Sequence, residues 1–178
     1  GSVGALQLPT SPPTATIAVN NQVNFTGNGI IETAAGQNLT LQGSIEGAGA
    51  LIKTGTGILT LATATNSHTG DLQLEGGTLR ITTADATGLG GLIFPTGKTA
   101  TLSTAKNLTF AAQFLANGAA TVDIDDKATI TINNNLTGTG SITKTGAGVL
   151  NLAANNSSFS GVINFSSGTV ITGNDNAL

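Results

Sequence analysis

Residues 140–152 read GSITKTGAGVLNL and repeat, 91 positions further on, the segment GALIKTGTGILTL of residues 49–61. The correspondence continues without a gap from about 16–83 onto 107–174. Between 39–82 and 130–173, 14 of 44 positions are identical. Short apolar segments separated by glycines inside a long repeat predict an elongated stack of similar units rather than a closed globule.

Pairs of apolar residues separated by one position recur about every 20 residues in both copies. This alternation is typical of strands with one buried face. Another set of apolar residues lies half a period out of phase, so each turn of chain holds at least two strands. Such a chain forms an all-β parallel β-helix, a solenoid of about eight turns and two tandem 91-residue repeats. The first residues of the pairs are Leu39, Leu59 and Leu79 in one copy and Ile130, Leu150 and Val170 in the other.

An antiparallel sandwich also has short strands and frequent turns, but it gives no reason for a gapless 91-residue repeat. We expect one continuous domain with a leading loop at 1–15, a first repeat at 16–106 and a second at 107–178. Gly1-Ser2 resembles a cloning scar, which would make the chain a fragment of a longer protein. We interpret Leu8-Pro9-Thr10 and Phe94-Pro95-Thr96 as loops inserted between turns, and Ser11-Pro12-Pro13 as incompatible with a central strand.

The composition excludes several classes of partner. Charged residues make up 8% of the chain, the net charge is −3, and the six Lys and Arg residues are scattered. Binding to nucleic acid or to an anionic membrane surface is therefore not expected. Cysteine is absent, and no apolar run approaches the roughly 20 residues of a membrane-spanning helix.

The residues also argue against catalysis, metal binding and a cofactor. His68 is the only histidine, and it occupies the repeat position of Phe159, so we interpret it as a packing or turn residue. Asp123 and Asp125 alternate with apolar residues and would project together from a strand, with Asp126 beside them. In β-helical polysaccharide enzymes such acids bind calcium or act as acid and base. A solvated strand face is the simpler interpretation, and we predict no site residues, no metal and no cofactor.

Lys53 and Lys144 recur in the same turn. They could bind an anion, but we expect each to cover the rod with its stem and keep its charge in water. Substitution by alanine would then change stability little.

Residues 140–170 resemble the β-strand repeat of bacterial autotransporter passengers. The matching pieces are a Lys-Thr-Gly-x-Gly turn, a Leu-x-Leu strand, an Asn-rich stretch, a Gly-led strand and a Gly-Thr-Val end; the first copy departs from this pattern at Thr65-Asn66 and His68. The resemblance implies a right-handed β-helix on the surface of a Gram-negative bacterium, exported through a C-terminal outer-membrane barrel. Members of this family are often adhesins.

We therefore expect a non-enzymatic, monomeric segment of a cell-surface or secreted passenger that acts as a stalk or as a host-contact surface. Its partner would be a host-cell surface or matrix protein, or a glycan. The alternative is a polysaccharide-active β-helical lyase or hydrolase that uses Asp123 and Asp125.

Overall fold

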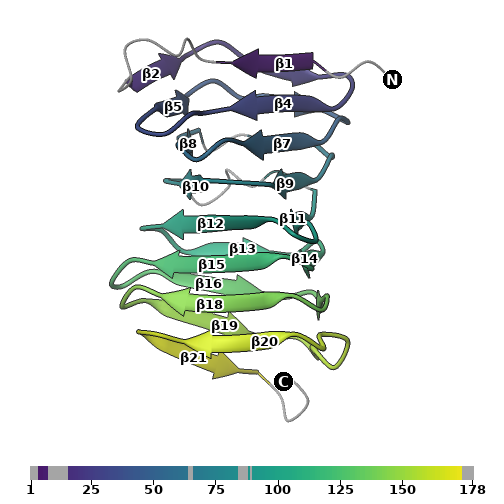
Figure 1. Ribbon diagram of the computed structural model, residues 1–178, viewed down its shortest axis with the longest axis vertical. Coiled ribbons are helices and arrows are strands. Elements are labelled where there is room, and N and C mark those ends of the chain that lie inside the picture. The colour runs from purple at the N-terminus through teal and green to yellow at the C-terminus, as the bar shows by residue number, and fades with distance from the viewer. Residues whose placement is uncertain (1–3, 8–15, 64–65, 84–87, 89, 174–178) are drawn as a thin grey trace.

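The computed structural model describes residues 4–7, 16–63, 66–83, 88 and 90–173. The described part of the chain contains strands, turns and bends but no helix, and hence no helix able to cross a membrane. All paired strands are parallel, and successive turns stack along one axis, with the N-terminus at the top of Figure 1 and the C-terminus at the bottom. The predicted right-handed parallel β-helix is confirmed, with about seven turns instead of eight.

Each turn places its strands at two or three positions around the rod, and each position forms a sheet that runs along the rod. Sheets A and B extend over almost the whole rod. The third position is occupied near the N-terminus by the short sheet C and further on by sheet D.

Sheet A comprises β1 (Gly4–Gln7), β4 (Gly29–Glu32), β7 (Leu51–Thr54), β9 (Leu72–Leu74), β11 (Leu92–Phe94), β14 (Phe114–Ala116) and β17 (Leu136–Thr137). Sheet B comprises β2 (Thr16–Val19), β5 (Asn38–Leu41), β8 (Ile58–Leu61), β10 (Thr78–Ile81), β12 (Thr99–Thr104), β15 (Ala119–Ile124), β18 (Ser141–Thr145) and β20 (Val162–Phe165). Sheet C comprises β3 (Val23–Phe25) and β6 (Ile45–Gly47), and sheet D comprises β13 (Leu108–Phe110), β16 (Thr129–Ile132), β19 (Val149–Leu152) and β21 (Thr169–Thr172).

The apolar pairs seen in the sequence form the core in the predicted register. Leu59 is fully buried and lies between Leu39 and Leu79 of the adjacent turns. Leu150 is equally buried and lies between Ile130 and Val170. Successive turns place apolar side chains at the same position around the axis of the rod. The core is therefore a set of stacked columns rather than one central cluster.

The two copies of the repeat do not lie on the same faces. In the first copy, β7 belongs to sheet A and β8 to sheet B; their equivalents in the second copy, β18 and β19, belong to sheets B and D. From β7 the chain makes four full turns to β17, which also lies in sheet A, and the next strand, β18, lies in sheet B. The 91-residue repeat is therefore offset around the rod by one sheet position, which the sequence repeat did not reveal.

Two expected loops contain strands. The segment around Phe94-Pro95-Thr96 is an ordinary turn of the rod: β11 pairs with β9 and β14, and a tight bend with a Lys98 N to Pro95 O hydrogen bond leads into β12. The interpretation of this segment as an inserted loop was wrong, because the proline occupies the bend and leaves the strand ladder intact. Within 1–15, β1 pairs with β4. Gly1-Ser2, Leu8-Pro9-Thr10 and Ser11-Pro12-Pro13 lie outside the described residues.

Candidate functional site

The acidic residues singled out in the sequence lie on the end of β15 and in the bend that follows it. Asp123 accepts hydrogen bonds from Thr145 Oγ1 at 3.0 Å and from Ser103 Oγ at 3.4 Å, which belong to the two adjacent turns. Asp125 pairs with Arg80, two turns away, at 3.4 Å. The carboxylates are therefore held by neighbours within the rod instead of converging on a common point.

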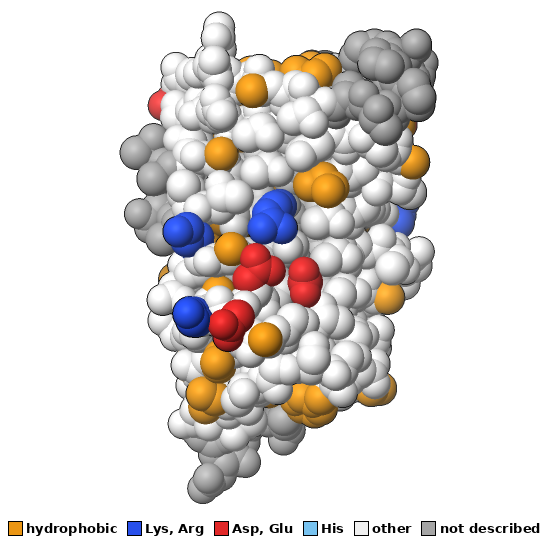
Figure 2. All heavy atoms as spheres, turned by 90° about the vertical axis from the view of Figure 1, so that its left-hand side faces the viewer, with side chains coloured by type: hydrophobic (Ala, Val, Ile, Leu, Met, Phe, Trp, Pro, Cys, Tyr) orange, Lys and Arg blue, Asp and Glu red, His pale blue; other side chains and the backbone are white. Residues whose placement is uncertain are grey.

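Charges of opposite sign are interspersed on this side of the rod. Figure 2 shows Asp and Glu side chains next to Lys and Arg side chains near the middle of the face, surrounded by uncharged surface. A further pair joins Lys98 and Glu75 at 2.9 Å. Among the described residues, no three His, Cys, Asp or Glu side chains are grouped so as to hold a metal ion. The face consequently offers neither a cation cage nor a strong field of one sign.

His68 is fully buried, and neither ring nitrogen has a hydrogen-bond partner among the residues that the structure describes. Burial lowers the pKa of His68 because desolvation disfavours the imidazolium. A general base must lie within hydrogen-bond reach of the proton that it abstracts, and the buried ring of His68 does not reach the surface of the rod. The residue is a packing residue in the segment between β8 and β9, as its alignment with Phe159 suggested.

The structure overturns the expectation for the two lysines. Lys53 and Lys144 are completely buried, and each Nζ donates hydrogen bonds to backbone carbonyl oxygens. Those of Lys53 are Thr54 O at 2.6 Å, Gly55 O at 3.0 Å and Gly76 O at 3.1 Å. Burial lowers the pKa of Lys53 to about 8, and the Glu32 carboxylate acts in the opposite direction.

The strand pattern contained a signal for this burial. Leu51 and Ile142 point into the core, so the residue two positions further along each strand points inward too, and that residue is the lysine. The prediction failed because lysine is usually assumed to keep its ammonium in water. One of the carbonyl acceptors that make burial of Lys53 possible is Gly76 O, which lies 23 residues further along the chain, in the next turn.

Two buried asparagines were also missed as structural residues. Asn66 Oδ1 accepts from Ile45 N at 2.8 Å, and Asn156 Oδ1 accepts from Leu136 N at 2.7 Å. Each side chain satisfies the first amide of a strand in the preceding turn. The sequence showed an Asn-rich stretch here, but not the hydrogen bond that requires it.

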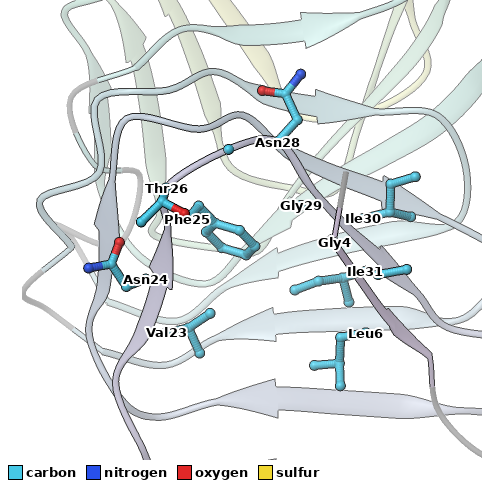
Figure 3. A pocket seen from close by; sticks show the side chains of 12 residues that line it. Gly4, Leu6, Val23, Asn24, Phe25, Thr26, Asn28, Gly29, Ile30 and Ile31 are labelled. Atoms are coloured by element: carbon cyan, nitrogen blue, oxygen red, sulfur yellow. The ribbon is translucent and has the colours of Figure 1, made fainter. Parts of the chain in front are cut away.

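A hollow of about 480 Å³ lies at the N-terminal end of the rod, between β1, β3 and β4. Figure 3 shows Leu6, Val23, Phe25 and Ile31 around it, with polar side chains only at Asn24, Thr26 and Asn28. The lining contains no titratable side chain and no pair of nucleophile and base. The hollow is lined by the first described turn of the rod, and among the described lining residues there are no groups that catalysis requires.

Comparisons with known protein families agree with the repeat architecture of the rod. Residues 51–81 and 142–173 match the model of the passenger-associated-transport-repeat. The chain contains two passenger-associated-transport repeats. The predicted resemblance to autotransporter passengers is confirmed. Over 133 residues, 74% of this chain, the sequence is 38% identical to the adhesin BmaC autotransporter of Brucella suis biovar 1 (strain 1330).

The chain spans 4% of the length of that relative. No solved structure matches the chain. Each matched repeat begins at an inward-facing residue, Leu51 or Ile142, and includes the buried lysine. It ends with two further strands, β9 and β10 in the first repeat and β20 and β21 in the second. The matched units thus coincide with the parts of the rod in which a turn has two strands instead of three.

Proposed function

We propose that this chain is a structural and adhesive segment of a bacterial surface passenger, with a stalk or host-contact role outside the outer membrane. The two passenger repeats and the similarity to an autotransporter adhesin support this proposal. The observation that carries it is the continuity of the rod. Strands of sheet B are hydrogen-bonded from β2 to β20, so each turn supports its neighbours along the whole described length.

The partner proposed for the contact surface is a host-cell surface protein, a matrix protein or a glycan. On the face shown in Figure 2, the uncharged surface around the paired charges favours short-range contacts over electrostatic attraction of a strongly charged ligand. We propose that the segment is a monomer and has no catalytic role.

No observation favours the alternative of a polysaccharide-active enzyme. Asp123 is bonded to the hydroxyl groups of adjacent turns and Asp125 to Arg80, so each carboxylate has its own partners within the rod. The proposal predicts no cleavage of acidic polysaccharides with or without calcium. A turnover that disappears in Asp123→Asn would overturn the proposal.

Binding and shape measurements test the proposed roles separately. The purified chain is immobilised and exposed to host matrix proteins, a glycan array and host cells, with a heat-denatured sample as control. Saturable binding supports a host-contact surface, and its absence overturns that role. Small-angle scattering is expected to show an elongated monomer; a near-spherical particle would overturn the stalk role.

A further inference from the structure

The ammonium group of Lys53 lies where two turns of the rod meet. Its acceptors Thr54 O and Gly55 O belong to its own turn, at the bend between β7 and β8, whereas Gly76 O belongs to the bend of the next turn. An ammonium group has three N–H donors and no acceptor. Three oxygens therefore use its full donor capacity inside a region from which water is excluded.

The second copy repeats this arrangement. Lys144 Nζ donates to Thr145 O, to Gly146 O at 2.8 Å and to Ser167 O at 3.4 Å. Gly55 and Gly146 both have positive φ angles, +71° and +72°. Backbone carbonyl oxygens at equivalent positions, 91 residues apart, thus accept from the two ammonium groups, with Ser167 in the place of Gly76.

A carboxylate from the preceding turn accompanies each lysine. Glu32 on β4 is in register with Thr54, and Asp123 on β15 is in register with Thr145. Burial lowers the pKa of Lys144, and the Asp123 charge opposes that shift as Glu32 does for Lys53. Asp123 and Glu32 are equivalent in the repeat, so this carboxylate belongs to the corner and not to an isolated acidic patch.

A glycine of the following turn makes room for each ammonium. Gly77 has φ +64° and Gly168 has φ +79°. A Cβ at Gly77 would lie 2.9 Å from Lys53 Nζ, and one at Gly168 would lie 2.7 Å from Lys144 Nζ. The positive backbone angle and the carbonyl oxygens of the preceding bend, which lie closer still, exclude a side chain there.

These contacts do not depend on which sheets meet at the corner. Lys53 lies between sheets A and B, whereas Lys144 lies between sheets B and D. The two lysines lie at different positions around the rod. Both nevertheless have an acidic residue in the preceding turn, carbonyl oxygens at the ammonium group and a glycine in the following turn. The corner is therefore specified by local sequence and by the turns directly above and below.

We propose that Lys53 and Lys144 are positioning residues that form a lysine bridge, defined as the buried ammonium with its carbonyl acceptors in two successive turns. The carboxylate of the preceding turn flanks the bridge as a neighbouring charge. The bridge fixes the register of the two turns that supply its acceptors, at any corner of the rod. A buried ionic group is well suited to this role, because a shifted register would leave a charge without acceptors.

Hydrogen exchange of backbone amides, followed in the full chain by mass spectrometry, tests the bridge. Lys53→Met keeps the stem and removes the ammonium. We expect exchange at Gly57, Glu75 and Thr78, whose amides bond across these turns, to accelerate about tenfold, as loss of a hydrogen bond to a charged group implies. The equivalent amides of Gly148, Ser166 and Thr169 should stay protected.

Lys144→Met should show the reciprocal pattern. Lys98→Met is the matched control, since Lys98 is an exposed lysine that pairs with Glu75 next to the same bend. If Lys53→Met does not fold, Glu32→Gln replaces it, with a smaller local acceleration expected. Unchanged exchange, or acceleration spread equally over both copies, would overturn the proposal.

Discussion

At the scale of single residues, the inward or outward position on a strand determines burial more than the residue type does. Leu59 and Lys53 both point into the core and are both fully buried, although one is apolar and the other carries an ammonium group. Leucine gains free energy from burial directly. Lysine is accommodated only because carbonyl oxygens at the bend accept hydrogen bonds from its ammonium group. The stacked columns therefore consist mainly of aliphatic side chains, with buried lysines only beside the Gly-rich bends.

Truncation of the core leucines should be costly and additive. Leu59→Ala and Leu150→Ala should each lower the free energy of unfolding by about 2–5 kcal/mol, from lost transfer energy and the cavity left behind. The sites lie in different sheets, so the double variant should lose about the sum. Urea denaturation measures all three. Ile58→Ala is the control because Ile58, next to Leu59, is 38% exposed, and an equal cost there would contradict the register.

His68 should make the rod sensitive to mild acid. Its pKa in the folded chain lies below the ordinary value of 6.5, so the unfolded chain binds the proton first as the pH falls. Stability should be fully present above pH 6.5 and decrease below it, by at most about 1.4 kcal/mol one unit lower.

The matching variant is His68→Phe, the residue found at the equivalent position of the second copy. Because the chain has no other histidine and Lys53, with a pKa of about 8, is largely protonated below about pH 7, this variant should show little change in unfolding free energy between about pH 7 and about pH 5.5, where carboxylates remain ionised. A persistent loss of stability in the variant would assign the acid sensitivity to other groups.

At the scale of elements, the bend between two strands determines the fold as much as the strands do. The Lys-Thr-Gly-x-Gly bends combine a left-handed glycine with backbone that packs directly on the bend of the next turn. Strands of four residues such as β7 and β8 are too short to define a stack alone. Register is fixed where the bends touch.

Two glycines with similar backbone angles separate conformational strain from steric contact. Gly97 has φ +72° and nothing within 4 Å of a Cβ, whereas Gly77 has φ +64° and faces Lys53 Nζ and the carbonyl oxygens of Gly55 and Gly57. Gly97→Ala should cost about 1–2 kcal/mol, the price of a left-handed alanine. Gly77→Ala should cost at least about 1 kcal/mol more. Equal costs in chemical denaturation would show that the bends do not pack as described.

At the scale of the whole molecule, periodicity predicted the architecture and missed the orientation of its parts. The recurrence of apolar pairs such as Leu39 and Leu59 identifies parallel stacking, because it is a direct consequence of one turn of chain. The offset of the second repeat by one face is not visible in that pattern. The offset depends on whether a turn has a strand at the third position. The strand β13 fills that position in one turn, whereas residues 66–71 form no strand in another. The burial of the two lysines could not be predicted from the sequence, because some of their carbonyl acceptors belong to other turns.

The offset also predicts that the two passenger repeats are interchangeable. Residues 51–81 span sheets A and B, and residues 142–172 span sheets B and D, with the same number of residues and the same inward positions. If local sequence and adjacent turns specify each unit, a chain with these two segments exchanged should fold into the same rod. Its unfolding should remain cooperative, with a free energy within about 2 kcal/mol of the parent chain, less than a severe core truncation. Circular dichroism and urea denaturation provide the measurement.

A variant that lacks Thr56 is the control for this exchange, because it shortens one bend by a residue and should reverse the inward and outward faces of the strand that follows. It should lose cooperative unfolding, whereas the exchanged chain should not. If the exchanged chain fails to fold while each segment is tolerated in its own place, the faces of the rod are not equivalent. The corner would then be specified by its position around the axis, and the similarity between Lys53 and Lys144 would not reflect a common structural role.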